Sequence, residues 1–256
     1  MQIAKSRKLR ARRCTRFHKM ELEVLISTGM RKGHFLVSRV PGSWVFPVTV
    51  LCCLLLAASG SSALALGKGT LEDPIVDSAM TWEEAAVKRA GPPVPEKIQK
   101  RQFVLEVCYW SFDGLIHQGQ IVVDRRLVSD IREVFRVALQ AHFPIASVIP
   151  ISHARFQWDD QKSMAANNTS GFNYRTVTGG TRLSKHALGF AVDINPVQNP
   201  YVRGDRVLPK GARYDPNASG ALNPECPVVR TFLRLGWTWG GQWNTLKDYQ
   251  HFQKVP

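Results

Sequence analysis

The sequence predicts one α+β domain over residues 102–256, built from a small antiparallel sheet, flanking helices and long loops. Two strand-like runs are separated by a turn that contains Asp113-Gly114, and an amphipathic helix follows them. Two irregular stretches, 159–181 and 196–224, are rich in polar residues, Gly and Pro. Short strands, few helices and long loops in mixed order favour α+β over a doubly wound parallel sheet.

Each element has its own signal in the sequence. The runs Phe103–Trp110 and Gln118–Val123 are strand-like, and Asp-Gly between such runs is typical of a hairpin turn. Between Leu127 and His142 the apolar residues recur at helical spacing. The remaining predicted elements are a strand over 146–151 and a helix over 228–235 that ends at Gly236, where a C-terminal glycine is common.

Composition excludes several classes of protein. The 256 residues are 44% apolar and 21% charged, which is not the composition of a collagen, a coiled coil or a wholly disordered chain. The net charge is +14, but residues 1–65 hold 11 of the 34 Lys and Arg and only 2 of the 20 Asp and Glu. Residues 66–256 therefore have a net charge of only +5, and nucleic-acid binding is not predicted.

The N-terminal region is typical of a secretory leader. No charged residue lies between Val40 and Gly67, and the apolar run Val48–Ala58 is too short for a membrane span of about 20 residues. Ala63-Leu64-Ala65 supplies a small-residue cleavage pattern. We expect residues 1–65 to be a basic leader and signal peptide, with Met30 as the possible true start, and the protein to be exported to the periplasm or cell envelope. The alternative is an uncleaved N-terminal membrane anchor; after cleavage no stable membrane span is expected.

Residues 66–101 are predicted to be a linker with at most one short helix, around Thr81–Arg89, because the run Gly91-Pro92-Pro93-Val94-Pro95 interrupts regular structure. Beyond the leader the chain has two cysteines, Cys108 and Cys226. They could pair in an oxidising compartment or remain as buried free thiols, and the sequence leaves both alternatives open.

The first chemical cluster lies at 184–195. As a strand, residues 190–195 would place Phe190, Val192 and Ile194 on one face and Asp193 on the other, next to a small alanine, which leaves room for a metal. His186 is seven residues upstream, roughly 23 Å along an extended chain or roughly 10 Å along a helix. The chain must therefore turn back for His186 and Asp193 to share an ion, and Gly189 tolerates such a bend.

The second cluster is Asp248-Tyr249-Gln250-His251, which follows a stretch rich in Gly and Trp over 236–243. Two histidines and an aspartate are a suitable ligand set for zinc, with the fourth position left to water. A further carboxylate such as Asp248 could take the proton from that water.

Together, SxHxxGxAxD, the Gly/Trp stretch and DxxH resemble the VanY-like D-alanyl-D-alanine carboxypeptidases and their L-alanyl-D-glutamate endopeptidase relatives, over roughly Phe103 to Gln253. The resemblance implies a hedgehog/D-Ala-D-Ala peptidase-like fold and Zn2+ bound by His186, Asp193 and His251. It implies Asp248 as catalytic base, and Arg175 as the arginine that stabilises the oxyanion. Arg182, which is closer to His186, is the alternative arginine. Ser184 and Trp239 are expected to contact substrate, although Trp237, Trp239 and Trp243 could equally belong to the core.

The resemblance thus implies an exported zinc peptidase that acts on peptidoglycan stem peptides, as a D-alanyl-D-alanine carboxypeptidase or a closely related endopeptidase. The alternative is a noncatalytic zinc-containing module of the same fold that binds the cell wall or signals. Asp159 and Asp160 are interpreted as solvated loop acids, and a role beside the metal or as calcium-type ligands is the less favoured alternative.

Overall fold

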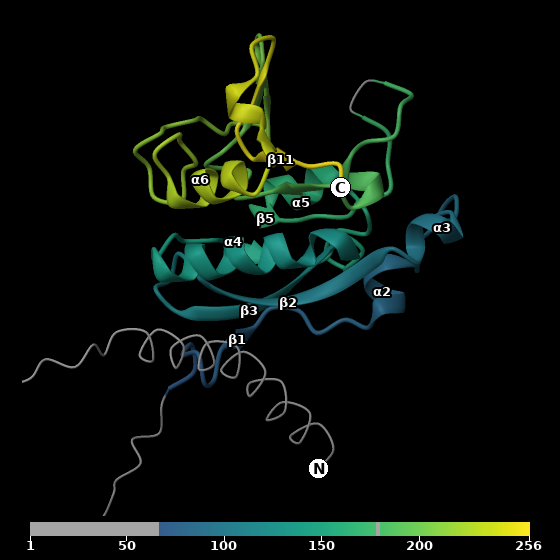
Figure 1. Cartoon of the computed structure of the whole chain (residues 1–256), viewed down its shortest axis with the longest axis horizontal. Coiled ribbons are helices and arrows are strands. Elements are labelled where there is room, and N and C mark those ends of the chain that lie inside the picture. Colours follow the sequence, from purple (N-terminus) through teal and green to yellow (C-terminus); the bar gives the residue numbers. More distant parts are fainter. Residues whose placement is uncertain (1–66, 178–179) are drawn as a thin grey trace, which may run out of the picture.

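The computed structural model describes residues 67–177 and 180–256. Figure 1 shows a lower layer made of a long hairpin and an upper layer of short strands and helices, with a central helix between them. The predicted α+β class is confirmed, because helices and small sheets occur in mixed order and the strand pairs are mostly antiparallel.

The predicted hairpin is confirmed as β2 (Gln102–Trp110) and β3 (Ile116–Asp124), which pair in antiparallel register from Gln102 opposite Asp124 to Trp110 opposite Ile116. Its turn uses the residues that signalled it. The Asp113 Oδ1 accepts a hydrogen bond from the Leu115 backbone N–H at 3.0 Å, and Gly114 has a φ of +77°.

The predicted central helix is α4 (Val128–Gln140), and a 3-10 turn over Arg125–Leu127 leads into it. Its buried side chains lie at helical spacing, and they pack on β2 on one side and on α6 (Pro227–Arg234) on the other. Asp130 joins this helix to the end of the chain, since its carboxylate accepts hydrogen bonds from Trp237 Nε1 and Lys254 Nζ. The apolar stripe consists of Ile131, Val134, Phe135 and Ala138.

Besides the sheet of the hairpin there are three small sheets in the described part of the chain. The one that matters most for the site has the order β6 (Ala191–Asp193), β11 (His251–Gln253) and β9 (Thr238–Trp239). The alternation predicted for residues 190–195 is confirmed, because Phe190, Val192 and Ile194 all belong to the main hydrophobic core. The second sheet has the order β10 (Lys247–Asp248), β7 (Tyr201–Arg203) and β8 (Arg206–Leu208), and the third pairs β4 (Ser147–Val148) with β5 (Asn168–Thr169).

One of the two remaining boundary predictions is corrected. The strand expected over 146–151 is only the two residues of β4, because its pairing with β5 ends there. Helix α6 follows the prediction closely, and Gly236 after it has a φ of +82°.

The segment expected to be a linker has more structure than the single short helix that the sequence predicts. It contains β1 (Ile75–Val76), α2 (Trp82–Ala86) and α3 (Glu96–Gln99). Strand β1 pairs in parallel with β3, and the side chains of Ala85, Ala86 and Val94 are buried against Val122 and Phe172. Thr81 caps α2 in a reciprocal capping box with Glu84, and the spacing of these two residues is a local signal for the start of a helix.

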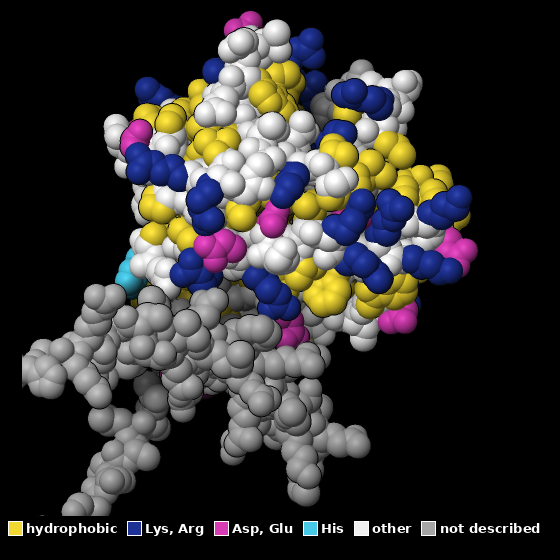
Figure 2. Space-filling model, viewed as in Figure 1, with side chains coloured by type: hydrophobic (Ala, Val, Ile, Leu, Met, Phe, Trp, Pro, Cys, Tyr) yellow, Lys and Arg dark blue, Asp and Glu magenta, His cyan; other side chains and the backbone are white. Residues whose placement is uncertain are grey.

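Cys226 is a free, buried thiol whose pKa is raised by burial, so it is not paired with Cys108. The predictions about the leader, its cleavage and Met30 fall on residues outside the described part of the chain. Within the described ranges no helix is both long and apolar enough to cross a bilayer. On the face shown in Figure 2, Lys and Arg side chains are dispersed among apolar and acidic ones rather than gathered in one patch.

Candidate functional site

The structure brings His186, Asp193 and His251 together at one buried point. His251 Nδ1 lies 2.9 Å from Asp193 Oδ1, His186 Nε2 lies 3.2 Å from Asp193 Oδ2, and the two imidazole nitrogens are 3.2 Å apart. All three residues are buried. They are the group of His, Cys, Asp and Glu side chains within the described residues whose donor atoms are close enough to share one ion.

Local backbone structure explains this convergence. His186 begins a 3-10 turn (His186–Leu188) that ends at Gly189, whose φ of +72° directs the chain into β6. A Cβ at Gly189 would lie 2.3 Å from Gln102 Oε1 and 2.6 Å from the Asp124 backbone nitrogen, so a larger residue would not fit. The bend inferred from the spacing of His186 and Asp193 is therefore present at Gly189.

His251 reaches the same point through strand pairing. Strands β6 and β11 are antiparallel, and Asp193 lies directly opposite His251 in the register. Directly opposed residues point to the same face of a sheet, with Cβ atoms about 5 Å apart. Two residues separated by 58 positions are thus brought together by two short strands.

Each histidine has its other ring nitrogen fixed. His186 Nδ1 lies 2.6 Å from the Gly171 carbonyl oxygen, and His251 Nε2 lies 3.2 Å from Gln253 Oε1. Because both partners accept hydrogen bonds, a neutral ring that donates its N–H to that partner would turn the lone pair of its other nitrogen toward Asp193. This orientation by surrounding acceptors is the usual arrangement of histidines that bind a metal.

The three donor groups fit a tetrahedral ion. Ligands 2.0–2.1 Å from a tetrahedral zinc lie about 3.3 Å from one another, close to the observed separations of 2.9 to 3.2 Å. Although burial favours a neutral carboxyl, His186 and His251 hold the pKa of Asp193 well below its usual range. Burial also opposes charge on His251, but its hydrogen bond to Asp193 and the nearby Asp248 raise its pKa to about 9.

Asp248, a half-buried residue whose carboxylate Oδ1 is buried, lies next to this cluster. Burial raises its pKa, His251 lowers it and the charge of Asp193 raises it, and the net pKa is about 6. Its Oδ1 has no hydrogen-bond partner within the described part of the chain. A polar atom buried without a partner is unfavourable, and it is available to a water or a substrate group.

The backbone holds Asp248 tightly. Asp248 on β10 pairs with Tyr201 on β7, and Gly240 lies directly against it. A Cβ added at Gly240 would come within 2.4 Å of the Asp248 carbonyl oxygen and 2.8 Å of its Cβ. Only a glycine at position 240 therefore permits this close backbone approach to Asp248.

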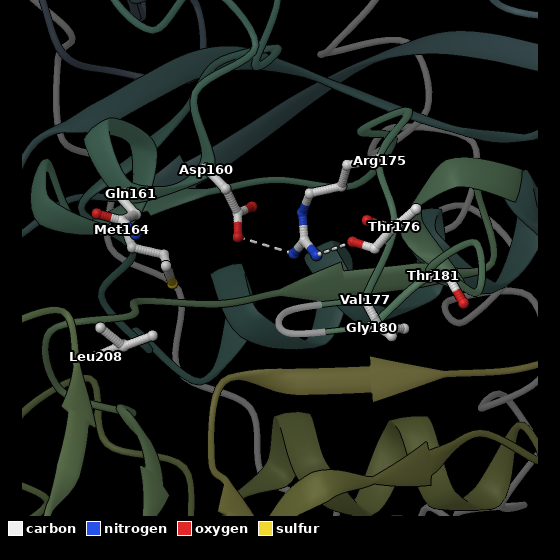
Figure 3. A pocket seen from close by; sticks show the side chains of 9 residues that line it. All are labelled: Asp160, Gln161, Met164, Arg175, Thr176, Val177, Gly180, Thr181 and Leu208. Atoms are coloured by element: carbon white, nitrogen blue, oxygen red, sulfur yellow. Dashed lines mark hydrogen bonds and ion pairs between the residues drawn. The ribbon is translucent and has the colours of Figure 1, made fainter.

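Arg175 lines a cavity of about 530 Å³, which Figure 3 shows. Its Nη2 forms an ion pair with Asp160 Oδ2 at 2.8 Å, and its Nη1 donates to the Thr176 carbonyl at 3.1 Å. Arg182 is exposed and does not line this cavity. The cavity is lined by Asp160, Gln161, Met164, Arg175, Thr176, Val177, Gly180, Thr181 and Leu208.

The interpretation of Asp159 and Asp160 as solvated loop acids is corrected by their contacts. Asp159 caps helix α5 (Asp160–Ala165) by accepting from the backbone N–H groups of Gln161 and Lys162. Asp160 carries the ion pair with Arg175. That pair has no local signal in the sequence, because 15 positions separate its members.

Ser184 and Trp239, the two expected substrate contacts, are both buried. Ser184 Oγ accepts from the His186 backbone N–H at 3.3 Å, so it supports the turn that carries that histidine. Trp239 is a core residue that is 2% exposed, and its only polar atom donates to the Tyr249 carbonyl at 2.8 Å. We therefore assign Trp239 to packing instead of substrate contact. The tryptophan beside the cluster is Trp243, whose ring centroid is 5.5 Å from that of His251.

Comparison with known proteins gave two matches. A family model described as D-alanyl-D-alanine carboxypeptidase matches residues 178–254. The peptidoglycan L-alanyl-D-glutamate endopeptidase CwlK of Bacillus subtilis (strain 168) is 25% identical over 160 residues, which cover 60% of this chain and 91% of that relative. No solved structure matches the chain.

Proposed function

Since the family match and the similarity to the Bacillus endopeptidase support a VanY-like zinc peptidase family, we propose that this chain is a zinc metallopeptidase that hydrolyses peptide bonds of peptidoglycan stem peptides. The bond is the terminal D-alanyl-D-alanine bond or a neighbouring one. The single observation that supports the chemistry best is the convergence of His186, Asp193 and His251 at one buried point beside Asp248, whose Oδ1 is buried without a hydrogen-bond partner among the described residues.

His186 Nε2, His251 Nδ1 and the Asp193 carboxylate would hold the zinc. A bound zinc lowers the pKa of a coordinated water to about 7 and polarises a peptide carbonyl. Asp248 would accept the proton of the attacking water on its free oxygen and return it to the leaving amine. Arg175 would face the negative charge that develops on the carbonyl oxygen, where a fixed cation favours the transition state.

The proposal includes the protein's location and fold type. The apolar run and small-residue pattern of residues 40–67 support export to the periplasm or cell envelope, where peptidoglycan is found. The antiparallel β6–β11 pair, with a histidine and an aspartate opposite each other, supports a hedgehog/D-Ala-D-Ala peptidase-like arrangement.

The test is to incubate the purified protein with purified peptidoglycan and to identify the released fragments by mass. We expect release of D-alanine or of a peptide fragment, its loss after treatment with a chelator, and its recovery when zinc is added back. The mass of the fragment identifies the bond. A matched control is His153→Gln, because His153 lies outside the cluster and its ring accepts only from the Arg155 backbone N–H.

A zinc-loaded protein that binds peptidoglycan but releases no fragment would contradict the proposal in favour of the noncatalytic module. Full activity in His251→Ala would contradict it as well, because that variant lacks one of the three donors. The control His153→Gln should keep both activity and metal.

A further inference from the structure

Asp160, the first residue of α5, contacts Arg175 directly, and both residues line the cavity of Figure 3. The Asp160 Oδ2 and the Arg175 Nη2 are 2.8 Å apart, and their side chains are 22% and 25% exposed, so water only partly screens the pair. Figure 3 shows the guanidinium held between Asp160 and the Thr176 carbonyl. Two of the three guanidinium nitrogens are thus used within the protein, while Nε is buried without a partner in the described residues.

The element that carries Asp160 is held firmly. Asp159 caps the start of α5, and the buried side chain of Asn168 ties the helix to the strand layer. Asn168 Nδ2 donates to Ser163 Oγ at 3.0 Å and to the Ile149 carbonyl at 2.8 Å. Because a site is more precise when its parts rest on anchored elements, Asp160 is suited to hold a longer side chain in place.

Asp160 has a second contact that leads toward the cluster. Its Oδ1 accepts a hydrogen bond from Asn173 Nδ2 at 3.1 Å, and the Asn173 backbone N–H donates to the His186 carbonyl at 3.1 Å. The Ser184 backbone N–H in turn donates to the Arg175 carbonyl at 3.0 Å. One carboxylate therefore connects the arginine with the turn that carries His186.

We infer that Asp160 is the positioning residue for Arg175: it fixes the guanidinium in the orientation in which Arg175 acts on the substrate carbonyl. This inference rests on the proposed function. An arginine side chain has many rotamers, and a planar, charge-assisted contact restricts them before substrate binds. A displacement of about 1 Å in a catalytic group can lower the rate about 100-fold.

The test is Asp160→Asn, which keeps the shape of the side chain but removes its charge. We expect kcat to fall about 10- to 100-fold with little change in KM, zinc content or thermal unfolding. Asp160→Glu should restore part of the loss. The control is Asp159→Asn, because asparagine also caps helices and Asp159 does not contact Arg175.

The same substitution made in the Arg175→Ala variant separates a positioning role of Asp160 from a purely structural one. In Arg175→Ala the effect of Asp160→Asn should shrink to less than about twofold, since a positioning residue has nothing left to position. An equal loss of kcat in both backgrounds would overturn the inference.

A crystal structure of Asp160→Asn provides a readout that needs no activity. We expect the Arg175 guanidinium to leave the place it occupies beside Asp160, and an unmoved guanidinium would overturn the inference. If the wild-type protein releases no fragments from peptidoglycan, the proposed function fails, whereas the crystal structure still decides whether Asp160 orients Arg175.

Discussion

Replacing Asp248 by asparagine should remove the proton acceptor while leaving the metal donors intact. Asparagine has nearly the same volume, so the tight contact with Gly240 is preserved. Loss of a general base lowers the rate about 10²- to 10⁴-fold, and we expect kcat to fall by that factor. Zinc content should not change, because His186, Asp193 and His251 supply the donor atoms.

The same substitution should stabilise the metal-free protein. Burial raises the pKa of Asp248 from 3.8 to about 6, so the folded state binds its proton more tightly than the unfolded state does. Stability therefore decreases as the pH rises from about 4 to about 6, and above pH 6 the ionised carboxylate costs about 3 kcal/mol. A neutral asparagine avoids that cost.

The assay pairs turnover with chemical unfolding. Fragment release and zinc content are measured on loaded protein, and unfolding by denaturant is measured on chelator-treated protein at several pH values. The free energy of unfolding of Asp248→Asn should exceed that of wild type by up to about 3 kcal/mol at pH 7, and this difference should shrink toward pH 4. Undiminished turnover would remove Asp248 from the chemistry, and an equal or lower stability at pH 7 would refute the argument from burial.

Three further predictions follow from other contacts. Because zinc binding requires neutral His251, whose pKa is about 9 in the metal-free protein, the apparent zinc affinity should rise about tenfold per pH unit between pH 7 and 9. The affinity is measured by competition with a chelator at several pH values, and an affinity that does not change with pH would contradict this prediction. Gly240→Ala should lower kcat about 10-fold or more with zinc retained, because the added Cβ would displace Asp248. The matched control Gly67→Ala should have no effect, because nothing lies within 4 Å of a Cβ at that position. Equal activities of the two variants would exclude the steric argument. Burial opposes charge on His117, but hydrogen bonds to Asp113 and Asp77 raise its pKa above 6.5, so the stabilisation by protonated His117 is complete below pH 6.5 and is lost as the pH rises through the folded-state pKa. Between pH 6 and pH 8 the free energy of unfolding, measured with denaturant, should therefore decrease more for wild type than for His117→Gln. An equal decrease in the two proteins would contradict this prediction.

The hairpin, the central helix and α6 could be predicted because each carries a complete local signal. Asp113-Gly114 specifies the turn, the apolar stripe of α4 repeats at helical spacing, and Gly236 ends α6. The structure of residues 75–99 could not be predicted in this way. Strand β1 has two residues and α3 has four, and such short elements exist only because they pack against β3 and the hydrophobic cluster around Val122.

The convergence of His186, Asp193 and His251 could be anticipated from residue types, but its geometry depends on strand pairing. Nothing in the spacing of Asp193 and His251 specifies that they lie opposite each other in register. Their hydrogen-bond acceptors, the Gly171 carbonyl and Gln253, had no signal at all, because one is a backbone atom of a distant loop. The sequence leaves the role of Trp239 open for a related reason, since an indole beside a glycine pair fits a core as well as a pocket wall.

The cavity that contains Arg175 depends on a part of the chain that the family match does not cover. Arg89, just after α2, donates to the Tyr174 carbonyl at 2.8 Å, and its guanidinium lies 5.2 Å from the centre of the Trp158 ring and 5.5 Å from that of Tyr174. Trp158 Nε1 in turn donates to the Lys88 carbonyl. Trp158 lies two positions before Asp160, and Tyr174 lies one position before Arg175. The segment at 88–89 therefore contacts the chain next to both members of the ion pair. The site is thus fixed from two sides, by strand pairing within the matched region and by cation–π and hydrogen-bond contacts from the N-terminal segment.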